Sequence, residues 1–315
     1  MPERPIYLDY NATTPVDPRV LEAMLPFFYE QFGNAASKTH AYGWVAEAAV
    51  KQAREQVAET LACSAQEIVF TSGATESINL ALRGAAEMYA RKGDHIITVA
   101  TEHKAVLDTC KALERQGRRL SLLDVDAGGR GDPDQLRDLI TDRTVLVSIM
   151  LANNETGVLQ SLPQLAEIAH SHGALMMSDA TQAVGKMPVD VDALGLDLLA
   201  LSAHKCYGPK GVGALYVRRR NPRVSLTPQL EGGGHERGLR SGTLNVPGIV
   251  ALGGGESAQF VVGVAVPLTA VHGQSDSVTI TATSAGDALA TAVSVLTTTA
   301  VNGDYSIYLP VILKP

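Results

Sequence analysis

The chain has 315 residues, 45% of them hydrophobic and 19% charged, and a formal net charge of -7. This length supports a sizeable core and about two domains, and the negative charge, without runs of Lys or Arg, excludes nucleic acid as the main partner. No window approaches the roughly 18 apolar residues of a membrane span, and residues 1–10 lack the apolar core of a signal peptide. Three cysteines, Cys63, Cys110 and Cys206, form no CxxC pair. We therefore expect a cytoplasmic protein without a membrane partner.

Helices are predicted on both sides of a glycine-containing loop near residues 33–34. Residues 6–18 predict a short strand and a capped turn, and a helix is then predicted from the spacing of Val20, Met24 and Leu25. From Trp44 onward, apolar residues recur every four positions with charges between them, at Val45, Ala49, Ala53, Val57 and Leu61. This pattern predicts an amphipathic helix.

The next segment predicts a strand over 68–71, small residues, and a helix that begins near Glu76. Free backbone N–H groups at such a helix start, beside the hydroxyls of Ser72 and Thr75, form an anion site. Turns of this composition commonly do no more than cap a helix. The motif therefore gains weight only from other residues that point to the same chemistry.

Strands and helices alternate through the middle of the chain. The predicted strands cover 95–100, 146–151, 174–178 and 198–202, and helices are predicted from Lys104 and Pro163. This alternation predicts right-handed βαβ units in a three-layer α/β/α body with a mostly parallel sheet, over about 15–250. Polar residues directly follow each strand, at 101–103, 153–157, 179–182 and 202–205. We expect them to meet at one edge of the sheet.

The residues at this edge suit a pyridoxal phosphate site. Lys205 follows an apolar strand and precedes a Gly-Pro turn, so partial burial would make its amine a candidate Schiff-base former. Ser202 and His204 could hold an anion, and Asp179 could pair with a pyridinium nitrogen. The further candidates are His103 over the ring face and Asn154 and Gln182 at the ring oxygen. The alternative for Lys205 is a solvated lysine at the start of a loop.

Eight motifs together resemble those of one enzyme family. They are YLDYNATTP at 7–15, FTSGATE at 70–76, TEHK at 101–104, NNETG at 153–157, DATQ at 179–182, SAHK at 202–205, YGPKG at 207–211 and GGGHERGLRSGT at 232–243. In this spacing they are similar to the motifs of cysteine desulfurases, which are fold-type I, class V aminotransferase-like enzymes. The resemblance covers about residues 5–258.

The resemblance implies a cofactor, a reaction and a set of residue roles. Pyridoxal 5'-phosphate would be bound as a Schiff base by Lys205, and the enzyme would convert L-cysteine to L-alanine and pass sulfur to an acceptor such as an iron–sulfur scaffold protein. His103 would stack on the ring and move protons. Further cofactor contacts are implied for Asp179, Asn154 and Gln182 at the ring and for Ala74, Thr75, Ser202 and His204 at the phosphate, with Thr243 of the partner subunit of a homodimer. No metal site is expected.

The sequence changes character after Ser257, which predicts a domain over 1–258 and a tail over 259–315. Alternation over 278–283 and 305–313 predicts antiparallel strands in the tail, whose composition resembles the end of a secreted immunoglobulin-like or surface-repeat domain. Both a genuine fusion and a truncated or spliced gene fit this junction. The tail has no cysteine and no arginine, whereas the family carries its sulfur-accepting cysteine and a substrate-binding arginine in this part of the chain.

Three interpretations of function remain open from the sequence. In the first, the chain is an active sulfur-transferring enzyme. In the second, it binds pyridoxal phosphate without desulfuration. In the third, it is a non-catalytic hybrid with an adhesion-type tail. We interpret Cys206, which adjoins Lys205, as a packing residue, like Cys63 and Cys110. Because the sulfur-accepting cysteine of the family is then missing, we expect desulfuration to be impaired.

Overall fold

The computed structural model describes residues 7, 9–253, 275–283 and 291–299. The chain divides into two compact units, Met1–Ser257 and Ala258–Pro315, and each is described by itself. Among the described residues, no helix is long and apolar enough to cross a membrane.

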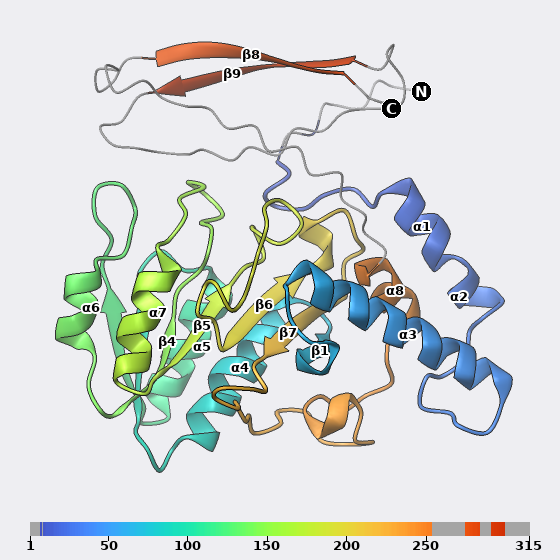
Figure 1. The fold of residues 1–315 in the computed structure, drawn as a ribbon, viewed down its shortest axis with the longest axis horizontal. Helices are drawn as coiled ribbons and strands as arrows, with labels where there is room; N and C mark the ends of the chain where they lie inside the picture. The colour runs from blue at the N-terminus through green and yellow to red at the C-terminus, as the bar shows by residue number, and fades with distance from the viewer. Residues whose placement is uncertain (1–6, 8, 254–274, 284–290, 300–315) are drawn as a thin grey trace. The chain divides into compact units, whose positions relative to one another are not determined.

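The first unit is built around a seven-stranded sheet with the order β1-β7-β6-β5-β4-β2-β3 (Figure 1). Strand β7 runs antiparallel to its neighbours, β1 and β6, and the other pairs are parallel. The strands are β1 Ile68–Thr71, β2 His95–Val99, β3 Arg119–Leu123, β4 Thr144–Ser148, β5 Leu175–Asp179, β6 Leu198–Ser202 and β7 Gly213–Val217. All of them except β3 are buried along their whole length because helices cover both faces of the sheet.

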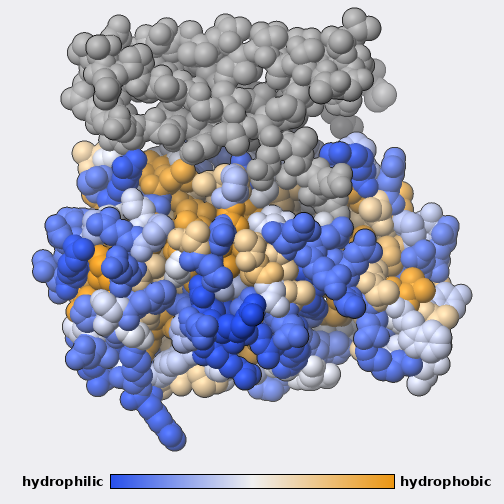
Figure 2. Space-filling view, viewed as in Figure 1, coloured by the Kyte–Doolittle hydropathy of each residue, from blue (hydrophilic) through white to orange (hydrophobic). Residues whose placement is uncertain are grey.

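The helices form the two outer layers. They are α1 Pro18–Met24, α2 Pro26–Tyr29, α3 Ala41–Thr60, α4 Ala74–Met88, α5 Lys104–Arg115, α6 Pro133–Leu139, α7 Leu162–Ser171 and α8 Val246–Gly253, with short 3-10 turns at Ala65–Glu67, Ala203–Lys205 and Glu236–Gly238. Apolar residues of α4 and α5 pack on one face of the sheet, and those of α3, α6, α7 and α8 pack on the other. The apolar side chains are thus concentrated inside, and the face of this unit seen in Figure 2 is largely hydrophilic. The predicted three-layer, mostly parallel α/β fold is confirmed.

Most of the predicted elements exist, with shifted ends. Strand β6 has the predicted bounds and α5 begins at Lys104 as predicted, whereas α4 begins at Ala74 rather than near Glu76. Strand β4 covers 144–148 instead of 146–151. The Met150 N–H donates to Glu102 Oε1 (2.5 Å) and not to a neighbouring strand, whereas the N–H groups of Ile149 and Leu151 still donate to carbonyls of β5.

In the segment over 6–18, residues 6 and 8, at the predicted short strand, lie outside the described residues. The predicted capped turn is present, because residues 10–12 form a turn and the Asp17 side chain caps α1. The N–H groups of Thr14 and Asp17 donate to the carbonyls of His204 and Tyr207. The predicted amphipathic helix is present as α3, and Ala53, Val57 and Leu61 are buried as predicted. Val45 is exposed, and Ala46 and Val50 are buried in addition. A strict four-residue repeat drifts by about 40° per step around a helix of 3.6 residues per turn, so one buried face mixes spacings of three and four.

The second unit contains one described strand pair. Strands β8 Ser275–Thr283 and β9 Thr291–Thr299 pair antiparallel, with Ser275 opposite Thr299. Strand β8 includes the predicted alternation over 278–283, β9 was not predicted, and the alternation over 305–313 lies outside the described residues. The boundary at 258 and the resemblance of 259–315 to a secreted domain stay predictions.

Candidate active site

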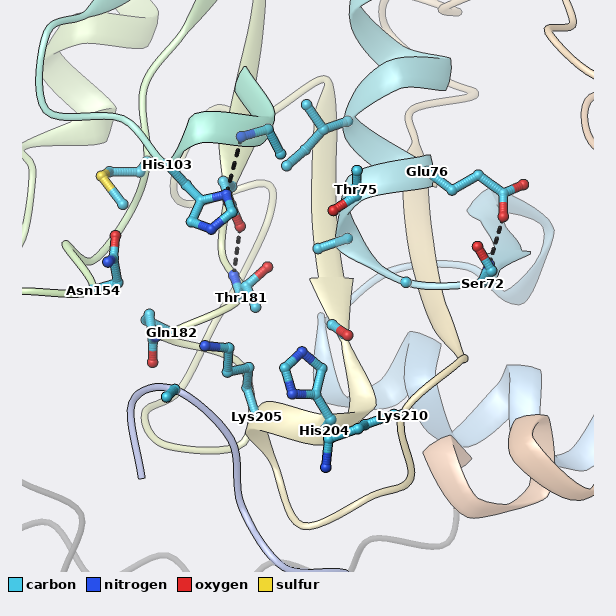
Figure 3. A pocket seen from close by; sticks show the side chains of 18 of the residues that line it. Ser72, Thr75, Glu76, His103, Asn154, Thr181, Gln182, His204, Lys205 and Lys210 are labelled. Atoms are coloured by element: carbon cyan, nitrogen blue, oxygen red, sulfur yellow. Dashed lines mark hydrogen bonds between the residues drawn. The ribbon is translucent and has the colours of Figure 1, made fainter. Parts of the chain in front are cut away.

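A cavity of about 430 Å³ lies at the carboxyl ends of β5 and β6, between the starts of α4 and α5 (Figure 3). Nine of the ten predicted site residues line it: Ala74, Thr75, His103, Asn154, Asp179, Gln182, Ser202, His204 and Lys205. The tenth, Thr243, is exposed and is not among the lining residues. The strand ends therefore meet as the sequence predicts.

One end of the cavity is suited to an anion. No side chain of the described residues caps the N-terminus of α4, so the N–H groups of its first turn face the cavity at Ala74 and Thr75. The N-cap, Gly73, has a φ of +147°, and a Cβ there would lie 3.6 Å from Ser202 Oγ. That distance is an ordinary van der Waals contact, so the positive φ, and not crowding, is what favours glycine at this turn. The carboxylate of Glu76 accepts from the N–H of Ser72 (2.7 Å) and holds the turn in place.

Lys205 and His204 lie on the short turn Ala203–Lys205 that follows β6. Burial lowers the pKa of Lys205, opposed by the nearby charge of Asp179. Its Nζ donates to the backbone carbonyl of Asn11, whose segment borders the cavity at Ala12. The pKa of His204 is lowered by burial and then by the charge of Lys205, and its Nδ1 lies 3.1 Å from Thr13 Oγ1. A partly buried amine with a lowered pKa is suited to nucleophilic attack on a carbonyl.

Asp179 ends β5 as a buried carboxylate at the cavity wall. Its Oδ1 accepts from the N–H of Thr181 (3.0 Å), and no cation forms an ion pair with it in the described part of the chain. The hydroxyl of Thr181, which also lines the cavity, has no partner among the described residues. A buried carboxylate of this kind is stable only beside a positive group, which a ligand in the cavity could supply.

Glu102 is a second buried acid near Asp179. Its Oε1 accepts from Met150 N–H, and its Oε2 has no partner within the described ranges. Its pKa is raised well above the usual range, by burial and then by the charge of Asp179. Two carboxylates in one apolar environment do not ionise together. The raised pKa therefore favours the neutral form of Glu102.

The remaining predicted residues surround the centre of the cavity. His103 Nδ1 accepts from the N–H of Ala105 (3.1 Å) at the start of α5, so a neutral ring carries its proton on Nε2. Asn154 Nδ2 donates to Glu155 Oε1 (2.7 Å). Gln182 Nε2 donates to the Asn11 carbonyl (2.9 Å). Two side-chain amides and an imidazole thus line the cavity together with Lys205.

Residues in and near the cavity that were missed from the sequence include Thr181 and Lys210, which line it, and Glu102 and Lys186. Thr181 lies within the DATQ motif, Glu102 within TEHK, and Lys186 shortly after DATQ, where its Nζ donates to Gln182 Oε1 (2.6 Å). The motifs themselves were the signal for the first two. Lys186 is brought back to the site only by the turn over 180–187, which the sequence pattern does not predict.

The three cysteines have the properties of packing residues. Burial raises the pKa of Cys206 to about 11 and the pKa values of Cys63 and Cys110 to about 12. Cys206 Sγ donates to the carbonyl of Ala203 (3.3 Å). Thiols with raised pKa values are poor nucleophiles because the reactive form is the thiolate.

The chain belongs to the class-V aminotransferase family, whose model matches residues 6–284. It is 62% identical over 249 residues to the cysteine desulfurase IscS of Anaeromyxobacter sp. (strain Fw109-5), covering 79% of this chain and 61% of that protein. It is 53% identical over 249 residues to the cysteine desulfurase IscS of Rickettsia rickettsii (strain Iowa), covering 79% and 60%. The chain thus spans about three fifths of the length of these curated relatives.

Solved structures agree with this membership. A NifS-like protein superposes with a TM-score of 0.76 at 45% identity, covering 79% of this chain and 68% of that one. The structure of SspA in complex with cysteine gives 0.75 at 43% identity, covering 78% and 71%. The comparisons give no support to the expectation of impaired turnover or of a non-desulfurating hybrid.

Pyridoxal 5'-phosphate is the cofactor of this family, and the residues of the cavity fit it. The uncapped start of α4 suits a phosphate, the unpaired carboxylate of Asp179 suits a protonated pyridine nitrogen, and the amine of Lys205 suits an aldehyde. The Thr181 hydroxyl, buried without a partner in the described part of the chain, can bond to such a ligand. The site of this chain therefore has the donors, the anion and the amine that the cofactor requires.

Proposed function

We propose that this protein is a pyridoxal phosphate-dependent cysteine desulfurase that converts L-cysteine to L-alanine and passes the sulfur to an acceptor thiol. The observation that carries the proposal is the convergence of Lys205, Asp179 and the start of α4 in one cavity. Family membership and the identity of the relatives support the same reaction. The solved complex of SspA with cysteine supports the substrate.

The cofactor contacts follow from the chemistry of each residue. Lys205 would hold the cofactor aldehyde covalently, and Asp179 would keep the pyridine nitrogen protonated. The phosphate would be held by Ala74, Thr75, Ser202 and His204, and the ring oxygen side by Asn154 and Gln182. When bound, pyridoxal phosphate withdraws electrons from the bonds around the amino acid α-carbon.

Two residues are suited to the proton movements that desulfuration requires. Burial lowers the pKa of Lys205, which favours the neutral amine that a general base requires. His103 has its Nδ1 engaged at the start of α5, so its Nε2 is the atom that would exchange a proton above the ring. We assign both as catalytic residues.

We further propose a homodimer in which Thr243 of the partner subunit completes the phosphate site, because Thr243 is exposed and is not among the residues that line its own cavity. The sulfur acceptors would include an iron–sulfur scaffold protein. Three free cysteines, Cys63, Cys110 and Cys206, support a reducing compartment such as the cytoplasm. In this proposal, 1–258 is the enzymatic domain and 259–315 is a separate β-rich tail.

The proposal is tested with the full chain loaded with pyridoxal phosphate. Alanine and sulfide are measured after addition of L-cysteine and dithiothreitol, which reduces the transferred sulfur to sulfide. We expect the wild type and the surface variant Lys51→Met to form alanine and sulfide in a one-to-one ratio. We expect neither product from Lys205→Ala. Equal turnover by Lys205→Ala, or no product from the wild type, would exclude this function.

A further inference from the structure

Lys186 is a partly buried lysine close to the site and outside the proposed catalytic set. It is not among the residues that line the cavity, and its Nζ donates to Gln182 Oε1 (2.6 Å), which does line it. Its backbone belongs to a turn that packs on the segment carrying Lys205. A Cβ on Gly185 would lie only 2.7 Å from Cys206 Cβ, so this close approach depends on glycine.

The charge of Lys186 is unusual for its surroundings. The titratable groups that face it are Lys205 and Cys206, and no carboxylate in the described ranges forms an ion pair with it. Its pKa is lowered to about 8, first by burial and then by the charge of Lys205. A partly buried ammonium without a counter-ion costs stability, and its hydrogen bond to Gln182 offsets part of that cost.

That hydrogen bond fixes the orientation of the Gln182 side chain. A lysine ammonium group only donates, so the amide must turn Oε1 toward Lys186. The carbonyl of Asn11 only accepts, so the amide must turn Nε2 toward Asn11 (2.9 Å). The opposite amide orientation would lose both bonds. The same carbonyl accepts from Lys205 Nζ, which joins the four residues in one hydrogen-bonded chain.

We propose that Lys186 is a positioning residue that holds Gln182 as a donor at the ring-oxygen side of the cavity. Its effect on the cofactor passes through Gln182 and through its charge beside Lys205. The part of this inference that concerns the cofactor rests on the proposed function. The bond between Lys186 and Gln182 does not, and it can be measured in the protein without cofactor.

The cofactor-bound test compares Lys186→Met with Lys186→Arg, which keeps a charged donor, and with Lys51→Met, which removes an exposed lysine of α3. We expect Lys186→Met to weaken pyridoxal phosphate binding on the order of tenfold. We also expect it to raise the pH at which the visible absorption band of the bound cofactor changes, because a positive neighbour is lost. Lys186→Arg restores both properties, and Lys51→Met matches the wild type.

A double-mutant cycle separates positioning from a general loss of structure. If Lys186 acts through Gln182, adding Lys186→Met to Gln182→Ala weakens binding less than Lys186→Met does alone. Full additivity of the two substitutions, or a Lys186→Met protein with the wild-type affinity and spectrum, would overturn the proposal.

The cofactor-free test follows the side-chain amide of Gln182 by NMR, with the signal assigned through its loss in Gln182→Ala. In the wild type the signal should move with pH around a midpoint near 8, as Lys186 loses its proton. In Lys186→Met it should not move over that range. A wild-type amide signal that ignores pH refutes the inference even if the cofactor binds, and a protein that fails to bind cofactor but shows this titration refutes only the proposed function.

Discussion

Two buried aspartates stand at opposite ends of neighbouring strands. Asp197 immediately precedes β6, is fully buried, and is surrounded by His170 Nε2 (2.8 Å), Met176 N–H (2.8 Å) and Arg218 Nε (3.3 Å). Asp179 ends β5, accepts one hydrogen bond from the N–H of Thr181, and lines the cavity. A carboxylate enclosed by protein donors stabilises a fold, whereas one that faces a cavity without a counter-ion is kept for a ligand. The two ends of the sheet thus have different tasks, and substitutions can separate them.

The largest effect is expected from Lys205→Ala at the cavity end. Removal of the amine that binds the cofactor and moves protons should lower kcat on the order of 10³-fold or more. Stability should barely change, because Lys205 makes one hydrogen bond, to the Asn11 carbonyl, within the described part of the chain. Alanine formation and urea unfolding are measured on the same preparation. A Lys205→Ala protein that keeps its activity but unfolds at a lower urea concentration than the wild type would contradict the functional role of the cavity end.

Asp197→Ala should produce the next largest effect, and on stability instead of catalysis. It leaves His170 without its carboxylate and Arg218 with Asp192 alone, and should lower the free energy of unfolding by about 3–5 kcal/mol. Activity per folded molecule should stay at the wild-type level. Asp197→Asn, which keeps the size of the side chain, serves as the milder variant if the alanine protein does not fold. A loss below about 1 kcal/mol in both variants contradicts a structural role.

Asp179→Asn is the matched substitution at the cavity end. It keeps the size of the side chain and removes the charge that faces the cofactor nitrogen. We expect kcat/KM to fall by about 10- to 100-fold, as for loss of a hydrogen bond to a charged group, with unfolding free energy changed by less than about 0.5 kcal/mol. Steady-state kinetics and urea unfolding check both numbers. Destabilisation similar to that of Asp197→Asn would show that the two aspartates do not differ.

The smallest effect concerns His95, which begins β2 and lies at the same end of the sheet as Asp197. Burial lowers its pKa to about 4, and its ring bonds to Thr144 Oγ1 (2.8 Å) and Ser121 Oγ (2.9 Å). Between about pH 6.5 and 4 the unfolded chain binds a proton that the folded chain does not, so stability falls with acidification by at most about 1.4 kcal/mol per pH unit. His95→Asn should show a shallower acid slope in urea unfolding. An unchanged slope would mean that His95 is not held neutral.

The sequence predicts the strand ends and their motifs, but it does not predict contacts between residues that are distant in the chain. The apolar run 198–202 followed by Ser-Ala-His-Lys located β6 and Lys205 because period, burial and motif coincide there. The antiparallel pairing of β7, the neutral state of Glu102 and the return of Lys186 to Gln182 depend on tertiary packing. Local patterns carry no information on such contacts.

The contacts of the N-terminal segment also could not be predicted from the sequence. The pattern over 6–18 predicts local structure alone, whereas the N–H groups of Thr14 and Asp17 donate to the carbonyls of His204 and Tyr207 after β6. The motif over 7–15 resembles the family, but only the tertiary structure shows that the Asn11 carbonyl meets Lys205 and Gln182.

The most direct test of the central claim is the position of the cofactor on the chain. The loaded protein is reduced with borohydride, digested, and mapped by mass spectrometry for the added pyridoxyl phosphate group. A single modification on Lys205, absent from Lys205→Ala and reduced in Asp179→Asn, is the expected result. A modification on Lys186 or Lys210, or none on any lysine, would contradict the assignment of this cavity as a pyridoxal phosphate site built on Lys205.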